Sequence, residues 1–427
     1  MEEDMPMCPW EGDQTMTRYN RRALLKAGAA FAGASAIGFP AISYGQAEKI
    51  KIGHLTPLTG FLGALGTYAT LGMKLAVEEI NQGGGVMGRQ LDVMSEDSVN
   101  PATAATKAQR MFEQDGATVL IGEINSAAAL TIMQVAARNK RLFLQTGARS
   151  DALRGKNCNK FTFHVDIPNT VMVNTVGKAL LRDNMVKDKK FFTLTADYIF
   201  GHDLLNAAKR FFGANQGNLI GDELIATDVT DFSPYLLKIR QAKPDVVCSN
   251  LAGNQVTTLI KQYAEFGLPY PIVGFNLNTA DAWAAGEGNL SGTWPTVWYH
   301  TLDVPASKTF VANFIKKNGK PPENHAWIEY ISFKMMAQAM NATKSTDTDP
   351  LIGYFEQETE FDILKRRKAY FRSWDHQLMQ EAYPFTVKAK GQAKDKWDTL
   401  DLGAAIPGPN ESLESIALTK EQNPCSM

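Results

Sequence analysis

Short apolar runs and helical stretches alternate along most of the chain, and this alternation restricts the fold more than any other feature of the sequence. The first strands are expected at 49–55, 90–95, 117–122 and 142–146, and the helices between them at 65–82, 101–114 and 127–139. Strands separated by helices of about ten to fifteen residues are typical of βαβ units and a parallel sheet. The sequence therefore predicts the α/β class.

The same alternation begins again after residues 161–165, which indicates a second unit of the same kind. Its strands are expected at 189–196, 219–226, 245–249 and 271–274, and its helices at 169–182, 203–212, 232–241 and 255–266. A chain of 427 residues exceeds what one hydrophobic core usually supports, so two lobes are expected. Later elements are expected at 293–299, 308–318 and 325–341, followed by an extended, peripheral tail at 391–427.

The N-terminal region carries a targeting signal. Arg21, Arg22 and Lys26 precede a mildly apolar run at 27–40, and small residues lead up to Ala47. This is the order of a signal peptide, and the adjacent arginines resemble the twin-arginine type. We expect cleavage near Ala47 and export to the periplasm. The alternative is a cytosolic chain with a basic N-terminus.

Charge and cysteine content exclude several classes of protein. The net charge is −1, which does not suit a nucleic-acid-binding protein. Outside the N-terminal region there is no run of about 20 apolar residues, so no membrane span is expected in the mature chain. The cysteines show no zinc spacing, and we expect neither a metal nor a cofactor. Cys158 could pair with Cys425, whereas Cys248 is expected to be a buried thiol.

Ligands of open parallel sheets bind beyond the carboxyl ends of the strands. The candidate segments are therefore the ones that follow the predicted strands, namely 56–66, 123–126, 147–150, 197–200, 250–253 and 275–278.

Several of these segments match a known family in order and spacing. The run Ile52-Gly53-His54-Leu55-Thr56-Pro57-Leu58-Thr59-Gly60 opens the first unit, and 76–81 with 83–89 form a helix-to-strand turn. Asp97 with 100–102 forms the next loop and helix start. Over residues 49–390 the chain resembles type I periplasmic binding proteins of the branched-chain amino-acid importer group.

The resemblance implies two Rossmann-like lobes joined by three hinge crossings, near 165–168, 298–301 and 372–375. The implied boundaries are 48–166 with 299–372 for the first lobe, 167–298 with 373–390 for the second, and 391–427 for the tail. A small solute would bind between the lobes, and the partners would be the permease and ATPase subunits of an ABC importer.

Three polar residues carry the expected ligand chemistry. Ser126 matches a family serine that contacts the ligand carboxylate, with helix capping as the alternative role. Arg149 replaces a small hydroxyl residue and could grip a carboxylate with two hydrogen bonds, with a salt bridge or a solvated loop as alternatives. Asn276 stands where amino-acid-binding relatives carry a Glu that pairs with the ligand ammonium, although Asp281 could substitute for it.

The remaining expected ligand contacts are apolar or small. Gly147 and Ala148 fall in a ligand loop of the family. An apolar wall is expected from Leu65, Tyr198, Phe200 and Leu251, with core packing as the alternative for each. Together these residues predict a carboxylate-bearing solute with an apolar or aromatic body.

Enzymatic activity is not expected. The histidines are scattered, and neither a nucleophile elbow nor a Walker loop occurs. The open alternatives are a binding protein for branched-chain or other amino acids, and a sensor of amides or other solutes.

Overall fold

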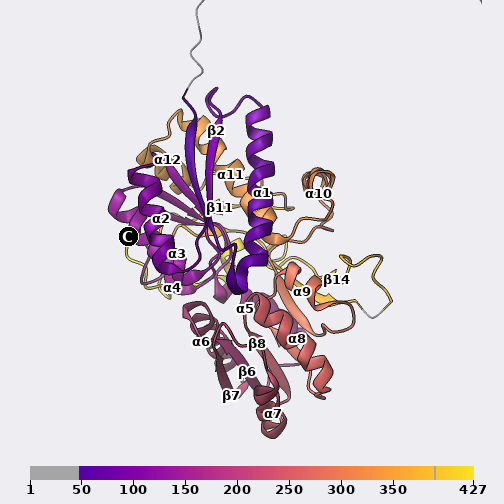
Figure 1. Cartoon of the computed structure of the whole chain (residues 1–427). Coiled ribbons are helices and arrows are strands. Elements are labelled where there is room, and N and C mark those ends of the chain that lie inside the picture. Colours follow the sequence, from indigo (N-terminus) through magenta and orange to yellow (C-terminus); the bar gives the residue numbers. More distant parts are fainter. Residues whose placement is uncertain (1–47, 389–390) are drawn as a thin grey trace, which may run out of the picture. The chain divides into compact units, whose positions relative to one another are not determined.

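The computed structural model describes residues 48–388 and 391–427 (Figure 1). The expected signal segment at 1–47, with its cleavage near Ala47, lies outside the described residues. Within the described part of the chain, no helix is both long enough and apolar enough to span a membrane.

The first half of the chain forms a five-stranded sheet in which all neighbouring strands are parallel. Its order is β2 (Leu91–Asp97), β1 (Ile50–Thr56), β3 (Val119–Gly122), β4 (Leu142–Gln145) and β5 (Thr162–His164). Every residue of β3 and β4 is buried, as expected for parallel strands covered by helices on both faces.

Alternate residues of these strands enter two different cores, because successive side chains of a strand point to opposite faces. Ile121 and Leu144 pack in the core that contains residues of α1 (Gly63–Gln82) and α11 (Asn324–Thr343). Leu120 and Phe143 pack with residues of α2 (Pro101–Glu113) and α3 (Ser126–Asn139). Figure 1 shows α2 and α3 lying side by side.

Gly72 allows α1 and α11 to pack closely. A Cβ atom at this position would lie 2.0 Å from the carbonyl oxygen of Ala326, which is far inside van der Waals contact. The missing side chain therefore sets the distance between these two helices, although they lie far apart in the sequence.

A second parallel sheet follows in the order β7 (Asn218–Ile225), β6 (Lys190–Ala196), β8 (Val246–Asn250) and β9 (Ile272–Gly274). Its helices are α5 (Asn169–Arg182), α6 (Ile199–Ala214), α7 (Ser233–Ala242), α8 (Asn254–Phe266) and α9 (Thr279–Ala285). Phe191 and Cys248 share a core with residues of α5 and α6, whereas Phe192 and Val247 pack with residues of α7 and α8. The prediction of an α/β fold with parallel sheets is confirmed.

A third, antiparallel sheet joins segments that lie far apart in the sequence. Its order is β10 (Thr293–Thr296), β13 (Tyr383–Val387) and β14 (Leu400–Leu402). The strands β11 (Tyr370–Phe371) and β12 (Leu378–Met379) form a separate pair. The later helices α10 (Pro305–Asn318) and α11 agree with prediction, and α12 (Thr348–Glu356) was not anticipated. The boundaries of the two lobes remain a prediction.

The tail is more structured than the sequence indicated. It supplies β14 to the third sheet and ends in a disulfide between Cys158 and Cys425, which lie 267 residues apart in the sequence. Cys248 is a free, buried cysteine, and burial raises the pKa of its thiol. The structure thus contains the pairing that the sequence had left open, and the prediction of a buried thiol is confirmed.

Candidate ligand-binding site

Loops from both parallel sheets meet around a small pocket. Its lining residues are Leu62, Leu65, Ile124, Gly147, Arg149, Tyr198, Phe200, Ala252, Asn276, Asn278 and His325. The cavity has a volume of about 20 Å³, which holds little more than one water molecule. A larger solute therefore needs the walls to move apart before it can enter.

Arg149 lies in the loop after β4, and its side chain is only 4% exposed. Its Nε donates to Oδ2 of Asp166 at 2.7 Å. Its Nη1 donates to Oδ1 of Asn276 at 2.6 Å and to Oδ1 of Asn278 at 3.1 Å. One guanidinium thus connects the loops that follow β4, β5 and β9, and the Asp166 carboxylate balances its charge.

The two asparagines present their oxygen atoms to Arg149 because their amide nitrogens donate elsewhere. Nδ2 of Asn276 donates to the carbonyl of Leu251 at 2.8 Å, and Nδ2 of Asn278 donates to Oδ2 of Asp281 at 3.1 Å. A solute carboxylate would therefore compete with two amide oxygens for Nη1 of Arg149.

Asp281 is a second acidic group beside this network. Burial raises the pKa of its carboxyl to about 7, the hydrogen bond from Asn278 lowers the pKa, and the charge of Glu323 raises it further. Close to neutral pH, the Asp281 carboxyl is therefore only partly ionised.

His325 enters the pocket from the first turn of α11. Its Nδ1 lies 3.2 Å and 3.1 Å from the two carboxylate oxygens of Glu323, and its Nε2 has no hydrogen-bond partner within 48–388 and 391–427. A Cβ atom on Gly147 would lie 3.2 Å from Cδ2 of the ring, so His325 packs directly against the loop that follows β4.

Aromatic side chains form another wall. The rings of Tyr198 and Phe200 have centroids 5.7 Å apart, and Phe61 contacts Tyr198 edge-on at the same distance. Burial raises the pKa of the Tyr198 hydroxyl, so this group stays neutral. The wall offers an apolar surface next to the guanidinium.

Six of the nine predicted contact residues line this pocket, and three do not. The six are Leu65, Gly147, Arg149, Tyr198, Phe200 and Asn276. Ala148 packs in the core beside α2 and α3, and Leu251 packs in the core beside α7 and α8. Oγ of Ser126 accepts a hydrogen bond from the backbone N–H of Ser150 at 3.3 Å.

The N-terminus of α3 is capped by Asn125 and not by Ser126. Oδ1 of Asn125 accepts from the backbone N–H groups of Ala127 at 2.9 Å and Ala128 at 3.1 Å. Oε1 of Glu123 accepts from the backbone N–H groups of Ile124 and Asn125. The side chain of Asn125 thus already occupies two of the N–H donors at which this helix end could have bound an anion.

Sequence reasoning missed the pocket residues Leu62, Ile124, Ala252, Asn278 and His325. The first four lie within the predicted strand-end segments, although none of them was singled out there as a contact residue. His325 follows no strand, and its only local signal is the Glu-x-His spacing with Glu323 at the start of a helix.

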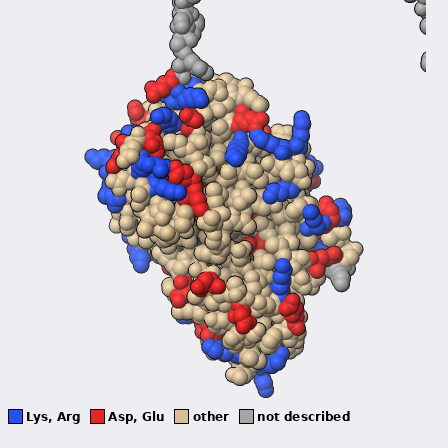
Figure 2. All heavy atoms as spheres, in the orientation of Figure 1, with Lys and Arg blue, Asp and Glu red and all other residues tan. Residues whose placement is uncertain are grey.

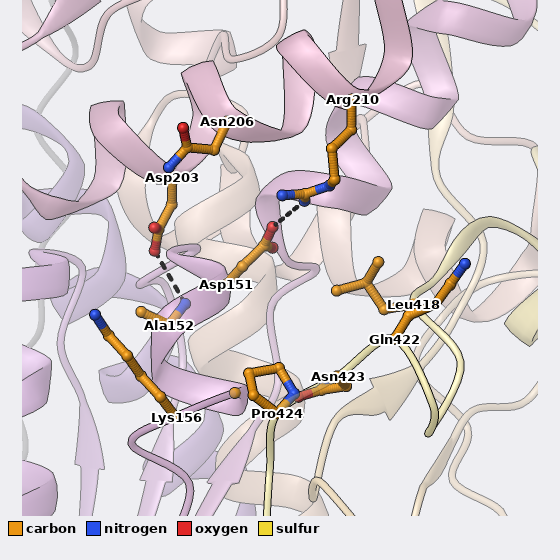
Figure 3. A pocket seen from close by; sticks show the side chains of 11 residues that line it. Asp151, Ala152, Lys156, Asp203, Asn206, Arg210, Leu418, Gln422, Asn423 and Pro424 are labelled. Carbon is orange, nitrogen blue, oxygen red and sulfur yellow. Dashed lines mark hydrogen bonds and ion pairs between the residues drawn. The ribbon is translucent and has the colours of Figure 1, made fainter. Parts of the chain in front are cut away.

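A larger cavity of about 480 Å³ lies elsewhere and is shown in Figure 3. Its walls come from 151–156, from α6 and from the tail at 418–424. Oδ2 of Asp151 accepts from Arg210 at 3.2 Å, and Oδ2 of Asp203 accepts from the backbone N–H of Ala152 at 2.9 Å. None of the predicted contact residues lines it. Since its two carboxylates already have partners, it is a weaker candidate than the pocket at the strand ends.

Acidic and basic side chains are interspersed on the face shown in Figure 2. This mixture agrees with the nearly balanced formal charge of the chain. Selectivity for a charged solute would therefore come from local groups such as Arg149, because a balanced surface gives little long-range attraction.

Comparison with known proteins identifies the family. Residues 49–392 match the family of periplasmic binding proteins. The chain is 25% identical over 316 residues to Leu/Ile/Val-binding protein homolog 7 of Brucella melitensis, a match that covers 70% of this chain and 78% of the relative.

Solved structures show the same fold. A periplasmic binding protein from Burkholderia mallei has a TM-score of 0.82 and 27% identity, and covers 89% of this chain and 99% of its own. A branched-chain amino acid ABC transporter ligand-binding protein from Burkholderia xenovorans has a TM-score of 0.77 and 25% identity, covering 89% and 100%. A solute-binding protein from R. palustris in complex with benzoate has a TM-score of 0.75 and 22% identity, also covering 89% and 100%.

The family model spans most of the sequence, and the relatives agree with the resemblance seen in the strand-end motifs. The chain therefore belongs to the periplasmic binding protein family, as a substrate-binding protein of an ABC transporter for small solutes, and it is similar to Leu/Ile/Val-binding proteins.

Proposed function

We propose that this protein captures a small organic carboxylate with an apolar or aromatic body, and passes it to the permease and ATPase subunits of an ABC importer. The observation that carries the proposal is the buried guanidinium of Arg149 beside the rings of Tyr198 and Phe200. A guanidinium binds a carboxylate through two hydrogen bonds, and aromatic rings accept an apolar body.

The position of Asn276 supports a solute without an ammonium group. An amide oxygen carries no formal charge, so it balances a buried ammonium poorly. Benzoate, which the R. palustris protein holds on the same fold, has the chemistry that this pocket favours. At 22% identity that protein supports the fold, and the residues of the pocket support the solute class.

An amino acid is the second candidate solute. The carboxyl of Asp281 lies 3.1 Å from Asn278, which lines the pocket, and could face an ammonium group. Because burial raises the pKa of Asp281 to about 7, this carboxyl is a weaker counter-ion at neutral pH than an exposed glutamate.

Solute entry requires the two halves to separate, because the cavity between the loops is far smaller than benzoate. We place the hinge at 165–168, 298–301 and 372–375, with the lobe boundaries predicted from the sequence. Hinge closure around a solute would then present one surface to the permease. We also propose export to the periplasm by the twin-arginine signal, and no enzymatic turnover.

Calorimetric titration of the mature chain with benzoate and with leucine tests this proposal. We expect benzoate to bind, and its affinity to fall at least tenfold in the double variant Arg149→Ala, Asp166→Asn, which corresponds to about 1.4 kcal/mol. Both residues are changed because removal of Arg149 alone leaves the buried carboxylate of Asp166 without its ion-pair partner, with only the backbone N–H of Ile167 donating to it.

Arg182→Ala is the matched control, since Arg182 is exposed and pairs with its neighbour Asp183. Benzoate affinity should be unchanged in that variant. Binding of leucine alone would favour the second candidate, and equal benzoate affinity in wild type and the double variant would remove Arg149 from the site.

A further inference from the structure

Glu323 and His325 form a buried pair at the start of α11. Glu323 is fully buried and His325 is 2% exposed. The carboxylate of Glu323 caps the helix, since its Oε2 accepts from the backbone N–H of His325 at 2.5 Å. The same carboxylate lies 3.2 Å and 3.1 Å from Nδ1 of the His325 ring, through Oε1 and Oε2.

This arrangement fixes the tautomer of the ring. A carboxylate accepts hydrogen bonds, so Nδ1 of His325 carries a proton and donates it to Glu323. In the neutral imidazole the lone pair then lies on Nε2, which becomes an acceptor. The carboxylate of Glu323 also holds the ring in one orientation, against Gly147.

Nε2 is a buried polar atom without a partner among the residues that the structure describes, and its side chain lines the candidate pocket. The neighbouring amides of Asn276 and Asn278 donate to Leu251 and Asp281. A buried acceptor left unpaired costs about 1–3 kcal/mol, so a bound group that supplies a donor gains affinity.

We propose that Nε2 of His325 accepts a hydrogen bond from a hydroxyl or N–H group of the solute, and that the solute carries this donor in addition to its carboxylate. Glu323 is a positioning residue that acts through the ring of His325. This inference rests on the proposed function, and it narrows the solute from an apolar carboxylate to a hydroxylated or N–H-bearing one.

Titration of the mature chain with benzoate, 3-hydroxybenzoate and 4-hydroxybenzoate at pH 7.5 tests the inference, because the probes differ only by one hydroxyl. We expect at least one hydroxylated probe to bind wild type about tenfold more tightly than benzoate. In His325→Phe the ratio between the two affinities should fall to near equality, because the phenyl ring has no acceptor for the hydroxyl.

Two further variants distinguish the loss of the hydrogen bond to the solute from a general failure of the variant to fold. His325→Gln keeps an acceptor oxygen, so it should retain part of the preference even if the phenylalanine variant does not fold. His202→Phe is the matched control, because His202 is exposed, pairs with Asp197 and does not line the pocket. It should keep the full preference for the hydroxylated probe.

The outcomes distinguish the inference from the function on which it rests. Benzoate binding with the same hydroxyl preference in wild type and His325→Phe would overturn the inference and leave the proposed function intact. If none of the three acids binds wild type, both the inference and the proposed solute class fail.

Discussion

Glu123 combines an unusual backbone with a buried acid at the end of β3. Its φ angle is 75°, and its side chain accepts backbone hydrogen bonds at 2.9 Å and 2.7 Å from the two residues that follow. Burial raises the pKa of the Glu123 carboxyl to about 7, although these hydrogen bonds and one from Ser98 lower it. The folded chain therefore holds a proton that the unfolded chain releases at lower pH.

We expect Glu123→Gln to remove a pH dependence of stability. Because the folded pKa is raised, the favourable contribution of Glu123 is complete below about pH 4.5 and is lost as the pH rises through about 7. Relative to the glutamine variant, the free energy of unfolding of wild type should fall by up to about 3 kcal/mol across this range. Urea unfolding at pH 5, 6, 7 and 8 measures the difference.

Glu113→Gln provides the comparison, because Glu113 lies exposed on α2. Its pH profile should run parallel to that of wild type. If the pH profile of unfolding free energy for Glu123→Gln were also parallel to that of wild type, burial would not control the protonation of the Glu123 carboxyl.

At the scale of residues, the position directly after a parallel strand was the sequence signal that located residues of the pocket. Arg149, Tyr198, Phe200 and Asn276 follow parallel strands, and all four line the pocket. His325 could not be found in this way, because it reaches the site from a helix that returns much later in the sequence. The residue that caps the N-terminus of α3 could not be assigned from the sequence either, since Asn125 and Ser126 are adjacent and both residue types are good caps.

At the scale of elements, the contact of α1 with α11 depends on one missing side chain. Gly72→Ala would place a Cβ atom 2.0 Å from a backbone oxygen of α11, and a backbone atom cannot move aside as a flexible side chain can. We expect a loss of about 1–3 kcal/mol in the free energy of unfolding, or more if the helices cannot shift. Chemical denaturation of the purified variant measures this loss.

Gly213→Ala is the matched substitution, since Gly213 lies in α6 and a Cβ atom there would have no neighbouring atom within 4 Å. At this position alanine should stabilise the helix by up to about 1 kcal/mol. Equal effects at the two positions would show that helix propensity, and not the close contact, governs Gly72.

The long elements could be predicted because their periodicity extends over many residues. The strands and helices of both parallel sheets fall close to the expected ranges. The strands β11, β12 and β14 have only two or three residues and, unlike the equally short β5 and β9, do not stand within a regular alternation of strands and helices. Their pairing depends on partners elsewhere in the chain, which local sequence does not reveal.

At the scale of the whole molecule, the Cys158–Cys425 disulfide closes most of the chain into a loop. A cross-link of this span restricts the unfolded chain, so the double variant Cys158→Ser, Cys425→Ser should lose about 2–5 kcal/mol of unfolding free energy. Urea unfolding without reductant measures this difference. Added reductant should destabilise wild type and leave the double variant unchanged; equal stability of the two proteins would contradict a stabilising role.

One face of the first sheet is covered by a helix that comes much later in the sequence, and this has a consequence for the order in which the protein folds. The strands β1 to β5 are synthesised before the second sheet, but one of their faces packs against α11 at Asn324–Thr343. The second sheet and its helices lie between Asn169 and Ala285, but its core also takes in Trp294, Phe385 and Leu400 from later segments. Contacts between neighbouring segments form before contacts that close long loops. Both parallel sheets are therefore expected to reach their finished state only after segments that leave the ribosome much later have packed against them.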